Sequence, residues 1–264
     1  MKIFQYELKF YRKALIMWCI SMIVLVFLSM VKYNMFSGAG QSAADLFAQL
    51  PQSIQTIFGL NGFNLTQASG FFGIMFMYIA LMATIHAAML GAGIISKEER
   101  DKTSEFLFAK PISRLKVTTF KILAGLVNIV IFNLVTLASS IITVEYFTKS
   151  SSTDRYIILL MCGLIMMQII FFFIGTAVAA SVKKPKTASS VATGVLLGTF
   201  ILTYFINMNS SFDSLKYLTP FKYFDAQTLL ASGKLDIIYV LISIILIFIC
   251  TVVTYLAYKN KDLK

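Results

Sequence analysis

The sequence predicts an all-α integral membrane protein that crosses the bilayer six times. Of its 264 residues, 58% are hydrophobic and only 13% are charged, whereas an average soluble domain is about 45–50% apolar and about 25% charged. The hydrophobic residues gather in six runs, each close to the roughly 20 residues that a helix needs to cross a bilayer. None of these runs alternates with period two, and all exceed the ~10 residues of an outer-membrane β-strand, so we expect helices.

The predicted architecture is a single transmembrane domain that covers residues 1–264. Before the first span, residues 1–13 mix Ile, Phe, Leu and Tyr with basic residues, which is typical of an amphipathic helix that lies along the inner membrane surface. The alternative is that this segment only extends the first span. The six spans are expected at about residues 14–33, 70–95, 118–145, 156–182, 187–208 and 236–258.

The distribution of charge predicts that both termini are cytoplasmic. Six spans place the two termini on the same side, and 17 of the 23 basic residues then lie on that side. Positive charge accumulates on the cytoplasmic side of membrane proteins. The acidic residues divide equally, so the net charge of +11 is entirely cytoplasmic, where it favours contact with anionic membrane lipid. The 24 Phe and the shortage of polar residues exclude a nucleic-acid-binding protein of similar charge.

Motifs for catalysis and for cofactor binding are absent from the sequence. No G-x-x-x-x-G-K-[ST] phosphate loop and no G-x-S-x-G or H-E-x-x-H motif occurs. A single His leaves little for general acid–base chemistry. Cys19, Cys162 and Cys250 lie far apart within apolar runs, which argues against a disulfide framework or a metal cluster. We therefore predict that the chain is not an enzyme and that it binds no metal or cofactor itself.

The charged segment between the second and third spans predicts a short cytoplasmic helix. Ser96 and Glu99 have the spacing of a capping box at its start. Glu98 and Lys102 are four residues apart in the order that favours an ion pair on one helix face. A proline further along disfavours helix at the residue before it. We therefore expect a helix over residues 96–110.

Phe106, Leu107 and Phe108 form an apolar ridge in this charged segment. The charges hold the segment in the cytosol, so the membrane does not bury the ridge. An exposed apolar surface with a polar rim is typical of a docking site for a partner protein. The alternative is a solvated loop that only joins two spans, but such a connection needs few residues and no Phe-Leu-Phe.

This segment resembles the coupling-helix motif in the permease subunits of type-2 ABC exporters, the ABC-2 transporter family. The family motif is roughly an upstream Glu followed by G-T-x-E-x-L-x-x-x-P-x-S-R, and Lys102 stands here where the family often has Gly. Residues 49–72 and 215–236 are also similar to outer segments of such permeases. The residues that match the motif are Glu99, Thr103, Glu105, Leu107, Pro111, Ser113 and Arg114.

The resemblance implies a multi-pass permease of the plasma membrane, in a bacterium, that works with a separate cytosolic ABC ATPase. Two permeases pair, as identical or homologous chains, and the ATPase dimer binds ATP and Mg²⁺ and moves the coupling helices. An apolar interior rich in Met and Phe favours a hydrophobic or amphipathic cargo such as a peptide or antibiotic. The residues expected to contact the ATPase are Glu98, Glu99, Arg100, Thr103, Glu105, Phe106, Leu107, Phe108, Pro111, Ser113 and Arg114.

Two other classes of protein are weighed against this interpretation. A secondary transporter or channel that works without an ATPase requires ionisable residues in mid-span, and only His86 qualifies. A membrane-embedded enzyme requires catalytic groups that converge at one membrane face, and the sequence shows no such set.

Small and polar residues within the spans give two further sets of candidates. Gly194 and Gly198 form a G-x-x-x-G pattern in the fifth span, which the resemblance places at the dimer interface, although packing within the chain is an equal alternative. Polar residues are expensive to bury in a span and often functional. The residues that either line a translocation path or hydrogen-bond a neighbouring helix are His86, Asn128, Asn133 and Gln168.

Overall fold

The computed structural model describes residues 2–39, 49, 51, 54–55, 63, 67–103, 113–148 and 154–261. These residues are overwhelmingly helical, and the part of the chain that is described contains no strand. Six helices are long and apolar enough to cross a membrane, which confirms the predicted all-α class with six spans. They are α1 (Lys2–Ala39), α4 (Ala68–Arg100), α6 (Arg114–Thr148), α7 (Asp154–Ser181), α8 (Ala188–Met208) and α11 (Ile237–Asn260).

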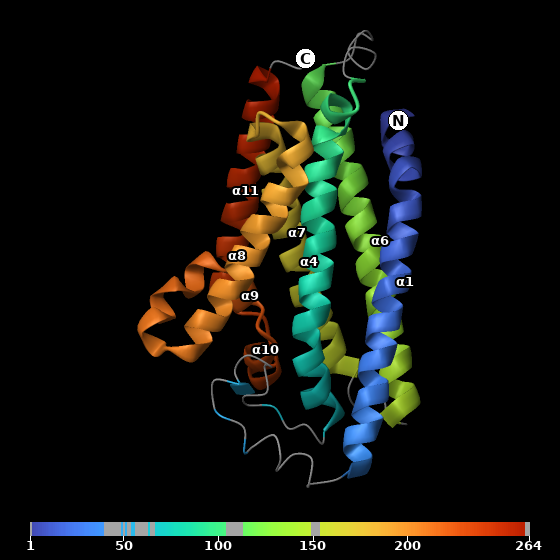
Figure 1. Ribbon diagram of the computed structural model, residues 1–264, viewed down its shortest axis with the longest axis vertical. Helices are drawn as coiled ribbons and strands as arrows, with labels where there is room; N and C mark the ends of the chain where they lie inside the picture. The colour runs from blue at the N-terminus through green and yellow to red at the C-terminus, as the bar shows by residue number, and fades with distance from the viewer. Residues whose placement is uncertain are drawn as a thin grey trace.

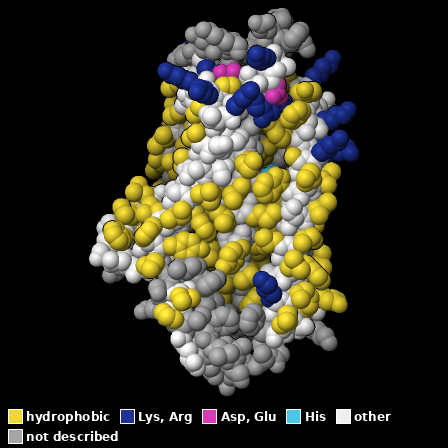
Figure 2. All heavy atoms as spheres, in the orientation of Figure 1, with side chains coloured by type: hydrophobic (Ala, Val, Ile, Leu, Met, Phe, Trp, Pro, Cys, Tyr) yellow, Lys and Arg dark blue, Asp and Glu magenta, His cyan; other side chains and the backbone are white. Residues whose placement is uncertain are grey.

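The long helices run side by side, and both chain ends lie at the same end of the bundle, here called the terminal end (Figure 1). α4 and α7 pack against each other at the centre, α1 packs on α6, α11 on α7, and α8 on α4. α7 is the most buried of the six helices and α11 the least. Hydrophobic side chains cover the visible sides of the bundle, and Lys and Arg gather toward the terminal end (Figure 2).

Short helices connect the spans at both ends. A 3-10 turn, η1 (Pro185–Thr187), joins α7 to α8 at the terminal end. At the opposite end, α8 and α11 are linked by η2 (Ser210–Leu218), α9 (Pro220–Tyr223) and α10 (Ala226–Ser232). Phe221 and Phe224, in and directly after α9, are buried, so this connection packs against the bundle.

The N-terminal segment continues the first span. α1 is one unbroken helix from Lys2 to Ala39, which corresponds to the alternative considered above and not to a separate interfacial helix over residues 1–13. Glu7 is buried within this segment. The segment therefore packs against other helices, and the reason for its burial lies in the contacts described below.

Two glycines let the central helices approach closely. A Cβ atom added at Gly91 of α4 would lie 2.1 Å from the carbonyl oxygen of Phe172, and one at Gly175 of α7 would lie 2.4 Å from the carbonyl oxygen of Ala88. Both distances are shorter than any non-bonded contact between carbon and oxygen. In each case the nearest atom belongs to the backbone of the other helix, so a side-chain movement cannot relieve the clash. Small residues at such crossings are typical of membrane helices, because dispersion contacts replace the hydrophobic effect there.

Gly91→Ala and Gly175→Ala should each destabilise the bundle, because a methyl group at either position forces α4 and α7 apart. We expect a loss of about 1–3 kcal/mol in the free energy of unfolding, the usual cost of overpacking, measured by denaturation of the purified protein in detergent. Gly93→Ala is the matched control on the same helix, because a Cβ there meets only the end of a side chain, the Tyr11 hydroxyl at 3.3 Å, and no backbone within 4 Å. Equal stability of all three variants and the wild type would contradict the close crossing.

Candidate functional site

The last turns of α4 carry two charged side chains that are almost fully buried. Lys97 is 4% exposed and Glu98 is 7% exposed, and both follow the long apolar part of the helix. A buried charge is costly unless an opposite charge and hydrogen bonds replace its hydration. The neighbouring helices α1 and α6 supply those partners.

The partner of Lys97 comes from α1. The Lys97 ammonium donates to both carboxylate oxygens of Glu7, at 2.9 and 2.8 Å, and Glu7 is 1% exposed. Aromatic rings of α1 surround the same ammonium, with Tyr6 at 4.9 Å and Phe10 at 4.2 Å from their centroids. Cation–π attraction adds to the ion pair in this desolvated setting. The first turns of α1 are therefore bound to the end of α4.

The partner of Glu98 comes from α6. Lys121 is 0% exposed, and its ammonium donates to the Glu98 carboxylate and, at 2.8 Å, to the carbonyl oxygen of Ile94. Lys97 also lies 3.7 Å from Glu98. Glu7, Lys97, Glu98 and Lys121 thus form a chain of alternating sign with no net formal charge, here called the buried ion cluster.

A second set of contacts joins the C-terminal end of the chain to the same place. Lys261 pairs with Glu99 at 2.7 Å and also donates to the carbonyl oxygen of Ala179 at 3.2 Å. The Arg114 guanidinium, at the first residue of α6, donates to the carbonyl oxygens of Lys259 and Lys261, at 3.3 and 2.8 Å. α1, α4, α6, α7 and α11 are consequently connected at the terminal end.

The chain leaves α4 through a Schellman turn. The amide of Thr103 donates to the carbonyl of Glu98 at 2.8 Å, and the amide of Lys102 donates to that of Glu99 at 3.4 Å, which is the paired bonding of that motif. Lys102 has φ 56°, and it is the one non-glycine residue with positive φ in the described part of the chain. The left-handed position normally favours Gly, so Lys102 occupies a backbone conformation that glycine adopts more easily.

The chain enters α6 through a helix cap. The Ser113 hydroxyl accepts a hydrogen bond from the backbone amide of Lys116 at 3.4 Å, the N-cap geometry that satisfies a free amide in the first turn. Arg114 follows directly and holds the C-terminal carbonyls. Residues 103 and 113, the two ends of the intervening segment, therefore have defined positions on the bundle.

Two expectations for this region are wrong. Ser96 does not begin a separate helix, because α4 continues through it to Arg100 and the Ser96 hydroxyl donates back to the carbonyl of Ala92 at 2.8 Å. Glu98 does not pair with Lys102, because its carboxylate turns inward to Lys121. Both errors have one cause: nothing in residues 96–100 interrupts the preceding helix, so its register decides which side chains face inward.

The structure describes six of the eleven residues expected to contact an ATPase. Arg100 and Asp101 are partly exposed and form an ion pair at 2.9 Å; the hydrogen bond from Arg100 holds the pKa of the Asp101 carboxyl below its usual value. The described members are Glu98, Glu99, Arg100, Thr103, Ser113 and Arg114, and those outside the described residues are Glu105, Phe106, Leu107, Phe108 and Pro111.

Sequence reasoning missed Glu7, Lys97, Lys121 and Lys261 as members of one site. The positions of the charged residues in the sequence nevertheless indicated such a site. Lys97 and Glu98 directly end a long apolar run, and Lys121 falls inside the predicted third span. Charges in such positions need partners on neighbouring helices, and the opposite signs of Glu7 and Lys97 were a visible match.

The polar residues of the spans lie inside the bundle. Asn133 of α6 donates to the side-chain oxygen of Gln168 on α7 at 3.1 Å, whereas Asn128 donates to the carbonyl of Ala124 in its own helix at 2.8 Å. His86 of α4 stacks on the Phe132 ring at 4.6 Å between centroids. These contacts agree with the packing alternative, and a role in a translocation path stays a prediction.

Gly194 and Gly198 lie on an exposed face of α8. A Cβ atom at either position would meet nothing within 4 Å, so neither glycine is needed for packing inside this chain. The face is free to contact lipid or a second chain, and the dimer interface stays a prediction.

Comparison with known protein families gives a match over nearly the whole chain. The sequence model of a family described as ABC-2 family transporter protein matches residues 1–263 of the chain. A search of curated proteins finds no match.

Lys102→Gly should stabilise the protein, because glycine adopts the left-handed turn without the clash that a Cβ atom causes. We expect a gain of about 1 kcal/mol in the free energy of unfolding, measured by denaturation in detergent. Lys9→Gly is the control, since Lys9 is exposed within α1 and the same substitution in a helix costs roughly 0.5–1 kcal/mol. A loss of stability for both variants would show that the turn does not have this geometry.

Proposed function

Because the chain belongs to the ABC-2 family of transporter proteins, we propose that it is the permease of an exporter driven by a separate cytosolic ABC ATPase. In this proposal the terminal end of the bundle faces the cytoplasm of a bacterial cell, where the Lys and Arg side chains gather (Figure 2). ATP and Mg²⁺ bind to the ATPase dimer, and the permease supplies the path across the plasma membrane.

The buried ion cluster is the observation that carries the proposal. It ties the end of α4 to α1 and α6, and the Glu99–Lys261 pair adds α11. A push on the segment between residues 103 and 113 therefore reaches four spans at once through ion pairs and hydrogen bonds. Such a connection suits a device that converts movement of an ATPase into movement of membrane helices.

The ATPase docks on residues 99–114 in this proposal, with two kinds of contact. Glu98, expected from the sequence as a contact, is buried in the ion cluster and is not part of the docking surface. Phe106 and Leu107 are the apolar anchors, and Glu105 is a polar partner at the rim. Arg100 and Thr103 add polar contacts at the end of α4. Arg114 has a positioning role, since its guanidinium already holds the carbonyls at the end of α11.

A second permease chain pairs with this one through α8 in the same proposal. Gly194 and Gly198 lie exposed on one face of that helix, and a G-x-x-x-G pattern lets two helix backbones approach closely. The cargo is a hydrophobic or amphipathic molecule, such as a peptide or antibiotic, in keeping with the apolar interior rich in Met and Phe.

Replacing both Phe106 and Leu107 by Asp should abolish the stimulation of ATP hydrolysis by the permease. A charge at each anchor opposes burial in the ATPase, so hydrolysis should fall to the rate of the ATPase without permease. The assay uses the purified permease and its ATPase reconstituted in lipid, with thermal unfolding to show that the variant is folded.

The matched control is the double variant Phe212→Asp and Leu218→Asp, which changes two exposed apolar residues of η2 at the opposite end. This control should stimulate hydrolysis as the wild type does. Normal stimulation by the Phe106 and Leu107 variant would overturn the proposed docking site.

A further inference from the structure

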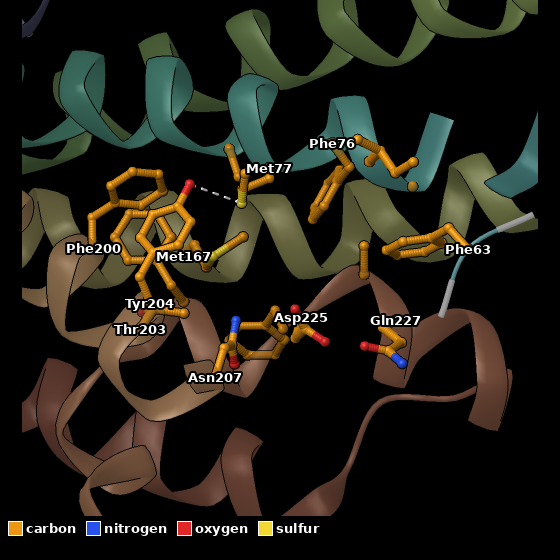
Figure 3. Close-up of a pocket in the computed structure, with 16 residues that line it drawn as sticks. Phe63, Phe76, Met77, Met167, Phe200, Thr203, Tyr204, Asn207, Asp225 and Gln227 are labelled. Atoms are coloured by element: carbon orange, nitrogen blue, oxygen red, sulfur yellow. Dashed lines mark hydrogen bonds between the residues drawn. The ribbon is translucent and has the colours of Figure 1, made fainter. Parts of the chain in front are cut away.

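A small cavity opens between α4, α7, α8, α9 and α10 (Figure 3). α9 and α10 lie in the half of the bundle away from the terminal end (Figure 1). The cavity has a volume of about 170 Å³, and an apolar cavity of about 150 Å³ is large enough to hold a benzene molecule. One phenyl ring or a branched aliphatic group therefore fits. Its aromatic lining consists of Phe63, Phe76, Phe200, Tyr204, Phe221 and Phe224.

The lining is unusually rich in aromatic and sulfur-containing side chains. Phe200 contacts Phe221 edge to face at 5.1 Å between centroids, and it contacts Tyr204 in the same way at 5.2 Å. The Tyr204 hydroxyl donates to the sulfur of Met77 at 3.4 Å. Aromatic rings present electron-rich faces that attract organic cations as well as apolar groups.

Asp225 provides the one formal charge among the residues that line the cavity. Its carboxylate caps α10, where one oxygen accepts hydrogen bonds from the amide and the hydroxyl of Thr228, each at 3.4 Å. In the part of the chain that the structure describes, no basic side chain lies within 4 Å of it. Asn207 and Gln227 lie on either side of it in Figure 3 and add polar atoms at this end of the cavity.

We propose that this cavity binds an organic ammonium compound that carries one aromatic or branched apolar group. The apolar group occupies the space between the aromatic rings, and the ammonium lies against the Asp225 carboxylate. A lipid acyl chain would fill the apolar part equally well but would leave the carboxylate without a cation. That this ligand is the exported cargo rests on the proposed function, whereas binding itself does not.

The test measures binding of three matched ligands to the full-length chain in phosphatidylcholine nanodiscs, without any ATPase. Isothermal titration calorimetry compares 4-phenylbutylamine, 4-phenylbutan-1-ol and 4-phenylbutyrate, with empty nanodiscs subtracted. The amine should bind saturably and about tenfold or more tightly than the alcohol, the value of a charge-assisted hydrogen bond. The carboxylate should not bind.

Asp225→Asn removes the charge and keeps the helix cap, because Asn is as good an N-cap residue as Asp. This variant should bind the amine and the alcohol with equal affinity. Asp236→Asn is the matched control, since Asp236 caps α11 in the same way, accepting from the amide of Ile238, and does not line the cavity. It should bind all three ligands as the wild type does.

Ala80→Leu fills the cavity from α4 and should weaken amine and alcohol binding alike, with thermal unfolding as the check on folding. Equal affinity of the wild type for amine and alcohol, or an unchanged amine preference in Asp225→Asn, would overturn the proposal. Because no ATPase is present, a failure here is separate from a failure of ATPase docking.

Discussion

Four buried charges of alternating sign, Glu7, Lys97, Glu98 and Lys121, determine how α1, α4 and α6 meet at the terminal end. Each charge has lost nearly all of its hydration, and each has an opposite charge of the cluster as its partner, with the Ile94 carbonyl and the rings of Tyr6 and Phe10 as further contacts. Removing one partner of such a pair typically costs about 3–5 kcal/mol, because the other charge stays buried. The contacts between these four side chains therefore determine how α1, α4 and α6 are positioned along one another.

Apolar residues of similar volume could stabilise this end of the bundle equally well, since burying ions gains little net free energy. Ion pairs add specificity of helix position, because an ammonium group must lie against a carboxylate, whereas one leucine side chain can pack at several positions along another. At the centre of the bundle, Gly91 and Gly175 bring α4 and α7 into backbone contact. α4 is thus held by the ion cluster at the terminal end and by its close contact with α7 at the centre. The turn that follows Arg100 therefore moves only together with the neighbouring helices.

The number of spans could be predicted from the sequence, because long segments without charged residues indicate membrane helices directly. The sequence also indicates a docking segment between the second and third spans, and this stays a prediction. It failed on the direction of side chains: Glu98 was assigned to a solvated pair with Lys102 but lies inward on Lys121. Pairing between helices far apart in the chain depends on how the helices rotate about their axes, and spacing within one segment does not report that. The aromatic cavity around Asp225 was missed for the same reason, since five elements contribute to it.

We infer that the buried ion cluster makes α1, α4 and α6 respond as one unit at the terminal end. Hydrogen–deuterium exchange of Lys121→Met, compared with the exposed control Lys116→Met, tests it most directly. In Lys121→Met, amides in the first turns of α1, the last turns of α4 and the start of α6 should lose protection together, while Lys116→Met should match the wild type. Loss of protection confined to α6 around residue 121 would contradict the claim.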